Sequence, residues 1–224
     1  MHAVGQIIHF DSQTSRPLRA WERGVNTLLP DDISVRWAKT VDSSFHARFS
    51  ATSRRYRYLI LNRDTRPAIA PSSVTWVREH LDAALMHDEA QVLLGEHDFS
   101  SFRAAGCQSK TAMRNVQEIS VQRSGQLVII EIRANAFLYH MVRNIAGVLI
   151  AVGRGDKQPG WTLEVLQAKN RCDGGVTARA SGLYLVDVEY PVEFGLPRIP
   201  LGPWFLESAD LSGSSGTGTP SLEG

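Results

Sequence analysis

The segment SRRYRYLILN, residues 53–62, alternates between two kinds of side chain over its whole length. Successive side chains of a β-strand point to opposite faces of a sheet, so this alternation predicts a strand. One face would be aromatic and the other basic. The two faces are formed by Tyr56, Tyr58 and Ile60 and by Arg55, Arg57 and Leu59.

Further strands and helices are predicted on the C-terminal side of this segment. Residues 115–134 predict a hairpin that turns at RSGQ, and residues 182–191 predict a closing strand. Helical spacing and terminal residues predict helices at 81–95, 134–153 and 161–170. Strands and helices that alternate in this way, with hairpins among them, predict an α+β fold with largely antiparallel sheets.

The N-terminal side is predicted to form strands at 7–10 and 32–41 and a helix at 14–29, whose buried stripe is Leu18, Trp21, Val25 and Leu28. Prolines bracket the connection RPAIAPSS at 66–73, which indicates a boundary between two units. We therefore predict an N-terminal half over residues 1–66, a C-terminal half over 67–207, and a disordered Gly/Ser/Thr-rich tail over 208–224.

Composition limits the possible functions. With 43% hydrophobic residues, 21% charged residues and a net charge of +1, the chain is ordinary for a globular protein, so binding to nucleic acid requires local clustering of charge. Neither Cys107 and Cys172 nor His46, His97 and His140 have the spacing of metal ligands, which predicts no metal site. The separated cysteines indicate a reduced, cytoplasmic protein. The longest apolar run is too short to span a bilayer, so no membrane is expected.

The most basic stretch is residues 42–66, with six arginines and two aspartates. Arginine forks match phosphate oxygens, and aromatic rings stack on unpaired bases. The interleaved rings are Phe45, Phe49, Tyr56 and Tyr58. This pattern indicates RNA binding, but a solvated strand whose arginines only keep a sheet in solution has the same pattern. The residues alone leave both interpretations open.

A second candidate is Arg143, within the helix predicted at 134–153. At helical spacing, His140, Arg143 and Gly147 lie opposite the apolar side. A glycine inside a helix is unfavourable, and it indicates close approach of another backbone or of a ligand. Arg143 would then face a cleft and pair with a carboxylate or a phosphate. Spacing alone favours the simpler interpretation, in which Arg143 points at water.

Several longer motifs, in this order, closely resemble the tRNA pseudouridine synthase A family. The resemblance extends from His2 to about Glu207, and its length in register makes it specific. The motifs are FHARFSATSRRYRYLILN at 45–62, GEHDFSSFRAAGCQSKT at 95–111, RNVQEISV at 114–121, ANAFLYHMVRNIAGVLIAVG at 134–153 and GLYLVDVEYP at 182–191.

The resemblance implies an enzyme that isomerises uridines at positions 38–40 in the anticodon stem-loop of tRNA. It implies a homodimer with no metal or organic cofactor. Each subunit would have two pseudo-equivalent halves, with mixed, mostly antiparallel sheets flanked by helices and the active-site cleft between the halves. A catalytic aspartate attacks the flipped-out nucleotide, the glycosidic bond breaks, and the uracil turns and reattaches through carbon.

The resemblance also implies roles for individual residues. Tyr56 matches the tyrosine that packs against the target base, and its hydroxyl could help to move a proton. Arg143 matches the basic residue that keeps the catalytic aspartate ionised and oriented. The expected contacts to RNA phosphates are Arg48, Arg54, Arg55 and Arg57.

One part of the motif set is missing. In this family the aspartate lies in the stretch Gly-Arg-Thr-Asp-Ala-Gly-Val-His-Ala, whereas this sequence begins Met1-His2-Ala3. We therefore expect the nucleophilic aspartate upstream of Met1, since none of the remaining aspartates matches. The alternative is a catalytically inactive RNA-binding fragment. A small-molecule enzyme on a similar sheet is a third interpretation, against which the arginine-rich strand argues.

Overall fold

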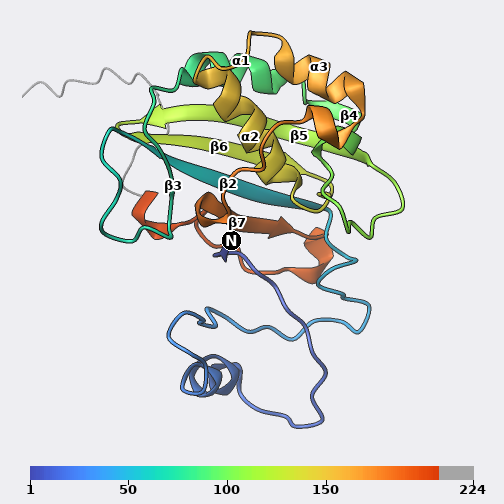
Figure 1. Ribbon diagram of the computed structural model, residues 1–224. Coiled ribbons are helices and arrows are strands. Elements are labelled where there is room, and N and C mark those ends of the chain that lie inside the picture. The colour runs from blue at the N-terminus through green and yellow to red at the C-terminus, as the bar shows by residue number, and fades with distance from the viewer. Residues whose placement is uncertain (207–224) are drawn as a thin grey trace, which may run out of the picture.

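A single mixed sheet organises the computed structural model, which describes residues 1–206 (Figure 1). The sheet has seven strands in the order β1-β7-β2-β6-β5-β4, and β3 pairs with β2. The strands are β1 His2–Ala3, β2 Ser53–Asn62, β3 Thr75–Val77, β4 Gly95–Asp98, β5 Met113–Ser124, β6 Leu127–Ala134 and β7 Leu183–Glu189.

Strand β2 is central and contains the whole segment 53–62 that the alternation predicted. It pairs antiparallel with both β6 and β7, so that Tyr58 lies between Ile130 and Leu183. Strands β5 and β6 form the predicted hairpin. Its turn contains Gly125 at φ +56°, a conformation that glycine adopts without a steric penalty. The β1–β7 and β2–β3 pairs are parallel, so the sheet is mixed and mostly antiparallel. The predicted α+β fold class is confirmed.

Three helices cover one face of this sheet (Figure 1). They are α1 Ala83–Gln91, α2 Met141–Gly153 and α3 Trp161–Ala168. The main apolar core, with Tyr58 and Ile130 of the sheet and Ile145 and Leu149 of α2, is fully or almost fully buried. Short helical turns complete the fold at Ala20–Gly24, Ser100–Phe102, Arg171–Asp173, Ala180–Gly182, Val192–Phe194 and Trp204–Leu206.

Two helix boundaries differ from the prediction. Helix α2 begins at Met141 rather than near residue 134, because His140 has φ 60°, in the left-handed region that interrupts a right-handed helix. Gly95, expected to end the first of these helices, instead begins β4 at φ +93°. Strands β3 and β4 are too short to give an alternating pattern, and the sequence did not predict them.

The N-terminal segment differs most from the prediction. The strands expected at 7–10 and 32–41 are absent from the described chain. The expected helix is shorter than predicted: it spans residues 18–26, and its central part, Ala20–Gly24, is π-helical. Its expected stripe is not buried, since Leu18 is 44% and Leu28 is 87% exposed. This segment extends away from the sheet (Figure 1). The apolar residues recur at the expected positions. Without a neighbouring strand to pair with or a layer to pack against, however, they form neither a sheet nor a core.

The proposed division into halves stays a prediction. Strand β2 lies before the boundary at residues 66/67 and β5, β6 and β7 lie after it, and all four share the one sheet. The tail predicted at 208–224 lies outside the described residues.

Candidate active site

Tyr56 lies on the helix-covered face of β2 and is half-buried. Its ring packs edge-on against Phe137, with the ring centroids 4.9 Å apart and the planes at 78°. Burial raises the pKa of the phenol, so the hydroxyl stays neutral at physiological pH. Among residues 1–206 this hydroxyl has no hydrogen-bond partner, so it remains able to donate or accept a proton.

Tyr58, two residues further along the same face, has a structural role instead. Its side chain is fully buried, and its hydroxyl lies 2.6 Å from Thr75 Oγ1 and donates to the carbonyl oxygen of Arg179 at 2.7 Å. Burial raises the pKa of Tyr58 to about 12. Alternation alone could not distinguish these two tyrosines, because they differ only in depth beneath the helices.

We expect replacement of Tyr58 by phenylalanine to lower the free energy of unfolding at pH 7 by about 1–3 kcal/mol, since the Arg179 carbonyl and the Thr75 hydroxyl lose their partner. In the unchanged chain, the raised pKa keeps the proton on folded Tyr58 while the unfolded chain releases it near pH 10. The contribution of Tyr58 to stability is therefore constant below pH 10 and falls as the pH rises toward 12.

Urea unfolding from pH 7 to 11 checks this expectation. The decline above pH 10 should be shallower in Tyr58→Phe. The residual slope is expected from Tyr190, whose pKa burial also raises to about 12, and from Tyr56 and Tyr184, whose pKa values burial raises as well. Tyr139→Phe is the control, because that side chain is 53% exposed. An unchanged slope in Tyr58→Phe would contradict the assignment.

Arg143 lies in the first turn of α2 and is not simply solvated. Its Nε donates to the carbonyl oxygen of Ala178 at 2.7 Å, and the Ala178 N–H donates back to the Arg143 carbonyl at 3.1 Å. Gly147 permits this contact, because a Cβ there would lie 1.9 Å from the Val176 carbonyl oxygen. The sequence analysis expected either another backbone or a ligand close to Gly147, and the structure places a backbone segment there. The segment 176–178 thus holds the guanidinium from one side.

His140 holds the same guanidinium from a second side, with its Nε2 3.2 Å from Arg143 Nη1. Burial, and then the charge of Arg143, lower the pKa of His140, so the imidazole is neutral and can accept this hydrogen bond. No carboxylate of residues 1–206 forms an ion pair with Arg143. A positioned guanidinium without an anion is a site at which a carboxylate or a phosphate can bind.

A buried polar network supports this arrangement. Asn144 is fully buried; its Nδ2 donates to the Phe102 carbonyl at 2.7 Å, and its Oδ1 accepts from Thr177 Oγ1 at 2.7 Å and from Arg171 Nη2 at 3.2 Å. These bonds fix the loop that leads to Ala178. The sequence analysis missed Asn144 and Arg171, although an asparagine among the apolar residues of a helix was a detectable signal.

Strand β1 lies beside the same loop. His2 and Ala3 run parallel to Tyr184 and Leu185, and His2 Nε2 lies 3.1 Å from the Ser181 carbonyl oxygen. Residues 178–182 therefore connect Arg143 with the buried core and with the first strand. They bind Arg143 through Ala178, Tyr58 through the Arg179 carbonyl, and β1 through Ser181.

The four arginines predicted to contact phosphates fall into two groups. Arg54 donates to two backbone carbonyls, that of Arg48 at 2.8 Å and that of Asn135 at 3.3 Å. Arg48 is exposed. Neither forms an ion pair within the described chain. Arg55 and Arg57 lie on the opposite face of β2, where both bind Glu131, at 2.5 and 2.6 Å.

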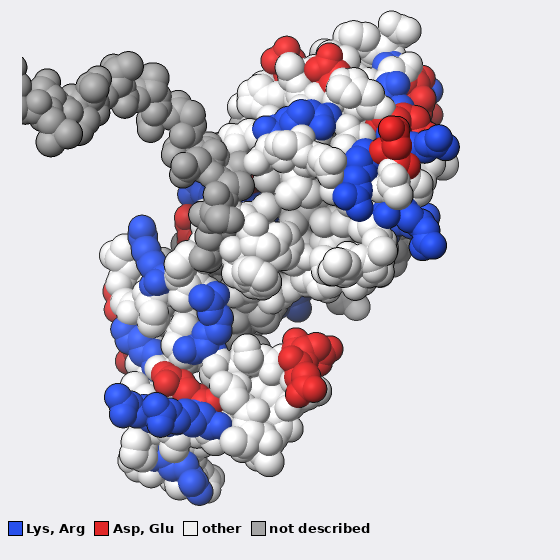
Figure 2. Space-filling model, turned by 90° about the vertical axis from the view of Figure 1, so that its left-hand side faces the viewer, with Lys and Arg blue, Asp and Glu red and all other residues white. Residues whose placement is uncertain are grey.

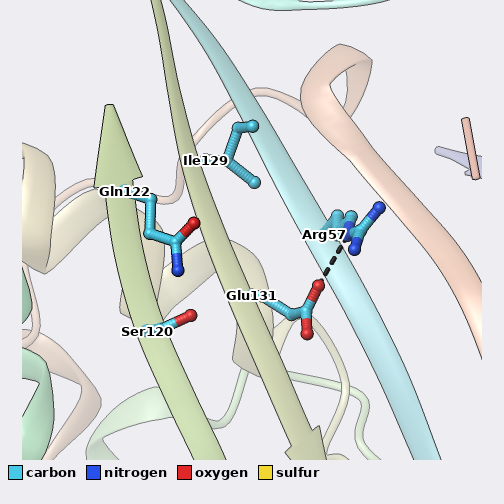
Figure 3. Close-up of a pocket in the computed structure, with 5 residues that line it drawn as sticks. All are labelled: Arg57, Ser120, Gln122, Ile129 and Glu131. Carbon is cyan, nitrogen blue, oxygen red and sulfur yellow. Dashed lines mark hydrogen bonds and ion pairs between the residues drawn. The ribbon is translucent and has the colours of Figure 1, made fainter. Parts of the chain in front are cut away.

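That opposite face carries a small hollow lined by Arg57, Ser120, Gln122, Ile129 and Glu131 (Figure 3). The Arg57–Glu131 ion pair crosses it, and neither Tyr56 nor Arg143 contributes to its lining. The hollow is therefore distinct from the Tyr56–Arg143 site. Its paired charges leave little free positive potential for a phosphate.

The molecular surface shows no concentration of one charge on the face displayed in Figure 2, where basic and acidic side chains are interspersed. Within residues 1–206 no group of histidine, cysteine, aspartate and glutamate side chains is arranged to hold a metal ion. No helix in that range is long and apolar enough to cross a membrane.

Comparison with known proteins assigns the class. A family model described as tRNA pseudouridine synthase matches residues 90–191, a range that includes Arg143 and the loop that binds it. The mixed α+β sheet agrees with the pseudouridine synthase fold. The matched family model and the α+β fold together indicate an RNA-modifying isomerase, a pseudouridine synthase.

The particular family follows from relatives that match over most of this chain. A tRNA pseudouridine synthase A of Aeromonas salmonicida (strain A449) is 58% identical over 210 residues, which cover 93% of this chain and 78% of the relative. Proteins of the same name from Vibrio campbellii and Tolumonas auensis are 55% and 56% identical over 206 residues, covering 92% of this chain and 78% and 79% of theirs. The chain belongs to the tRNA pseudouridine synthase A family.

Proposed function

We propose that the enzyme isomerises uridines at positions 38–40 in the anticodon stem-loop of tRNA and acts as a cytoplasmic homodimer without a metal or an organic cofactor. The observation that carries the proposal is Arg143, which is positioned by Ala178 and His140 and forms no ion pair with a carboxylate of residues 1–206. Two free thiols, Cys107 and Cys172, agree with a reducing compartment.

The chemistry requires no co-reactant, because pseudouridine is an isomer of uridine. An aspartate attacks the flipped-out nucleotide, and the bond between the ribose and the uracil nitrogen breaks. The uracil turns, its carbon bonds to the ribose, and the aspartate is released; in net, the proton of that carbon is transferred to the uracil nitrogen that left the ribose. In the proposal Tyr56 packs against the base, and its neutral, unpartnered hydroxyl helps to transfer that proton. Arg143 keeps the aspartate ionised and oriented.

The four arginines expected to contact RNA phosphates are not equally available to do so. Arg48 and Arg54 contact the RNA phosphates, since neither forms an ion pair with a carboxylate of the described chain. Phosphate contacts by Arg55 and Arg57 stay a prediction, against which their bonds to Glu131 argue.

We further propose that the aspartate belongs to a segment ahead of Met1. Two observations support this. The family motif aligns its Val-His-Ala with Met1-His2-Ala3. Because β1 runs parallel to β7, a chain continued back from His2 would pass along residues 181–182, toward the loop that binds Arg143. By itself, the polypeptide of residues 1–224 would then be the alternative, an RNA-binding fragment without its nucleophile.

Tritium release from uracil-labelled tRNA tests the proposal. We expect residues 1–224 to release none above background, and a chain extended upstream through the in-frame codons to include the aspartate motif to be active. Replacing that aspartate by alanine should abolish the activity. Both chains should bind tRNA, with an affinity that falls as salt rises.

Other outcomes would contradict separate parts of the proposal. Turnover by residues 1–224 alone would show that the nucleophile is within them. A folded, extended chain that binds tRNA without turnover would contradict the enzymatic function. Absence of salt-sensitive tRNA binding would favour a small-molecule substrate.

A further inference from the structure

We propose that Phe49 is a stacking platform for an unpaired base of the bound RNA, presented by a rigid turn at residues 45–50. The inference rests on the proposed function, because it adds a binding position for the same substrate. It separates Phe49 from the other aromatic residues of the basic stretch, whose roles the sequence could not distinguish.

The turn is anchored from beneath by Phe45, which is only 7% exposed. The Phe45 ring contacts Tyr190 and Phe194, each with a centroid separation of 5.1 Å. The Tyr190 hydroxyl also donates to the Ala47 carbonyl at 2.7 Å. Side chain and backbone of the turn are thus both fixed to the segment that follows β7.

Hydrogen bonds within the turn restrict it further. The Ser50 N–H donates to the His46 carbonyl, and the His46 N–H donates to Ser50 Oγ, both at 2.9 Å. The His46 ring accepts at Nδ1 from the N–H groups of Arg48 and Phe49, at 3.1 and 3.3 Å. The imidazole therefore closes the turn and is held against the Phe49 ring.

Despite this order, the Phe49 side chain is 75% exposed. The Phe49 ring contacts the His46 ring, with the ring centroids 4.3 Å apart and the planes at 36°. The His46 ring in turn contacts the His9 ring, with the centroids 4.4 Å apart. The Arg48 guanidinium lies over the Phe49 ring, 5.6 Å from its centroid, and the ring is still largely exposed. An aromatic ring that is fixed, exposed and flanked by a guanidinium is the arrangement that binds single-stranded nucleic acid, because each base has a π-face and each nucleotide a phosphate.

Arg54 connects this turn to the Tyr56 site. Its guanidinium donates to the carbonyls of Arg48 and Asn135. Asn135 lies two residues before Phe137, whose ring packs on Tyr56. An RNA loop whose target uridine lies at Tyr56 would therefore present a neighbouring unpaired base near Phe49. The basic flank favours RNA over an apolar protein partner, for which Arg48 would be a poor neighbour.

Binding of residues 1–224 to two RNA hairpins tests the inference. One is an anticodon stem-loop with 2-aminopurine in its loop, and the other is a hairpin of equal charge with a longer paired stem and a minimal loop. We expect Phe49→Ala to weaken binding of the stem-loop by about five- to a hundredfold and to abolish the quenching of 2-aminopurine, with an unchanged salt slope. The paired hairpin should bind as before, and Phe49→Trp should retain binding and quenching.

Two matched variants define the specificity of the effect. Phe10→Ala removes another exposed phenylalanine, 62% exposed against Trp21, and should change nothing. Arg48→Met should weaken both RNAs and reduce the salt slope by about one. Near-equal melting temperatures would show that the variants are folded.

The outcomes separate this inference from the proposed function. If Phe49→Ala binds and quenches like the unchanged chain, or weakens both RNAs equally, the stacking platform is wrong and the proposed function stands. If the unchanged chain binds neither RNA, the proposed function is wrong and this inference with it.

Discussion

Replacement of Arg143 by methionine is expected to lower kcat for pseudouridine formation about a hundred- to a thousandfold in the extended chain, with tRNA affinity within about threefold. The expected magnitude is that of removing one positioned donor from a catalytic site. The reason is local: Ala178 and His140 occupy Nε and Nη1 and leave the rest of the guanidinium for the carboxylate. Without it, the aspartate loses orientation, and its pKa rises toward that of an isolated carboxyl group.

The same series contains the control and the decisive variant. Arg154→Met removes an arginine at the other end of α2, where it pairs with Asp156 and Glu79, and should leave kcat unchanged. Arg143→Lys retains the charge but not the fork geometry, and should recover only part of the activity. If Arg143→Met retained full kcat, or lost tRNA binding in the same proportion as kcat, the orienting role would be wrong.

Replacement of Gly147 by alanine is expected to destabilise the chain by about 1–3 kcal/mol or more, even though alanine is the better helix former. Its Cβ would lie 1.9 Å from the Val176 carbonyl oxygen and 3.4 Å from the Ala178 nitrogen, both backbone atoms. Either α2 or the loop must therefore move. The melting temperature should fall by several degrees, measured by circular dichroism at one protein concentration.

Gly24→Ala is the matched control for this change. Gly24 also lies in a helical turn, but a Cβ there would meet nothing within 4 Å, so its stability should be unchanged or slightly raised. Gly147→Ala should also lower kcat in the extended chain, because the Ala178 carbonyl that binds Arg143 moves with the loop. A melting temperature equal to that of Gly24→Ala would contradict the close approach.

Much of the fold could be predicted from local patterns. The alternation over 53–62, the hairpin and the three helices were all correct in kind, because each has its own apolar face and bounding turn residues. The strands predicted at 7–10 and 32–41 were wrong, and the helix predicted at 14–29 is shortened to residues 18–26, because no neighbouring element covers these apolar residues.

The sequence by itself determined the family and the α+β class, because these depend on motifs in register and on local periodicity. Through the family motifs it also supplied Tyr56 and Arg143 as candidate site residues, and their roles stay a prediction. Only the tertiary structure decided which residues of one type have which role. Tyr58 is buried in a hydrogen-bond network, whereas the hydroxyl of Tyr56 has no hydrogen-bond partner in the part of the chain that the structure describes. Phe45 anchors a turn, whereas Phe49 is displayed by it. These differences depend on what a distant part of the chain places over each side chain, and no local pattern encodes that.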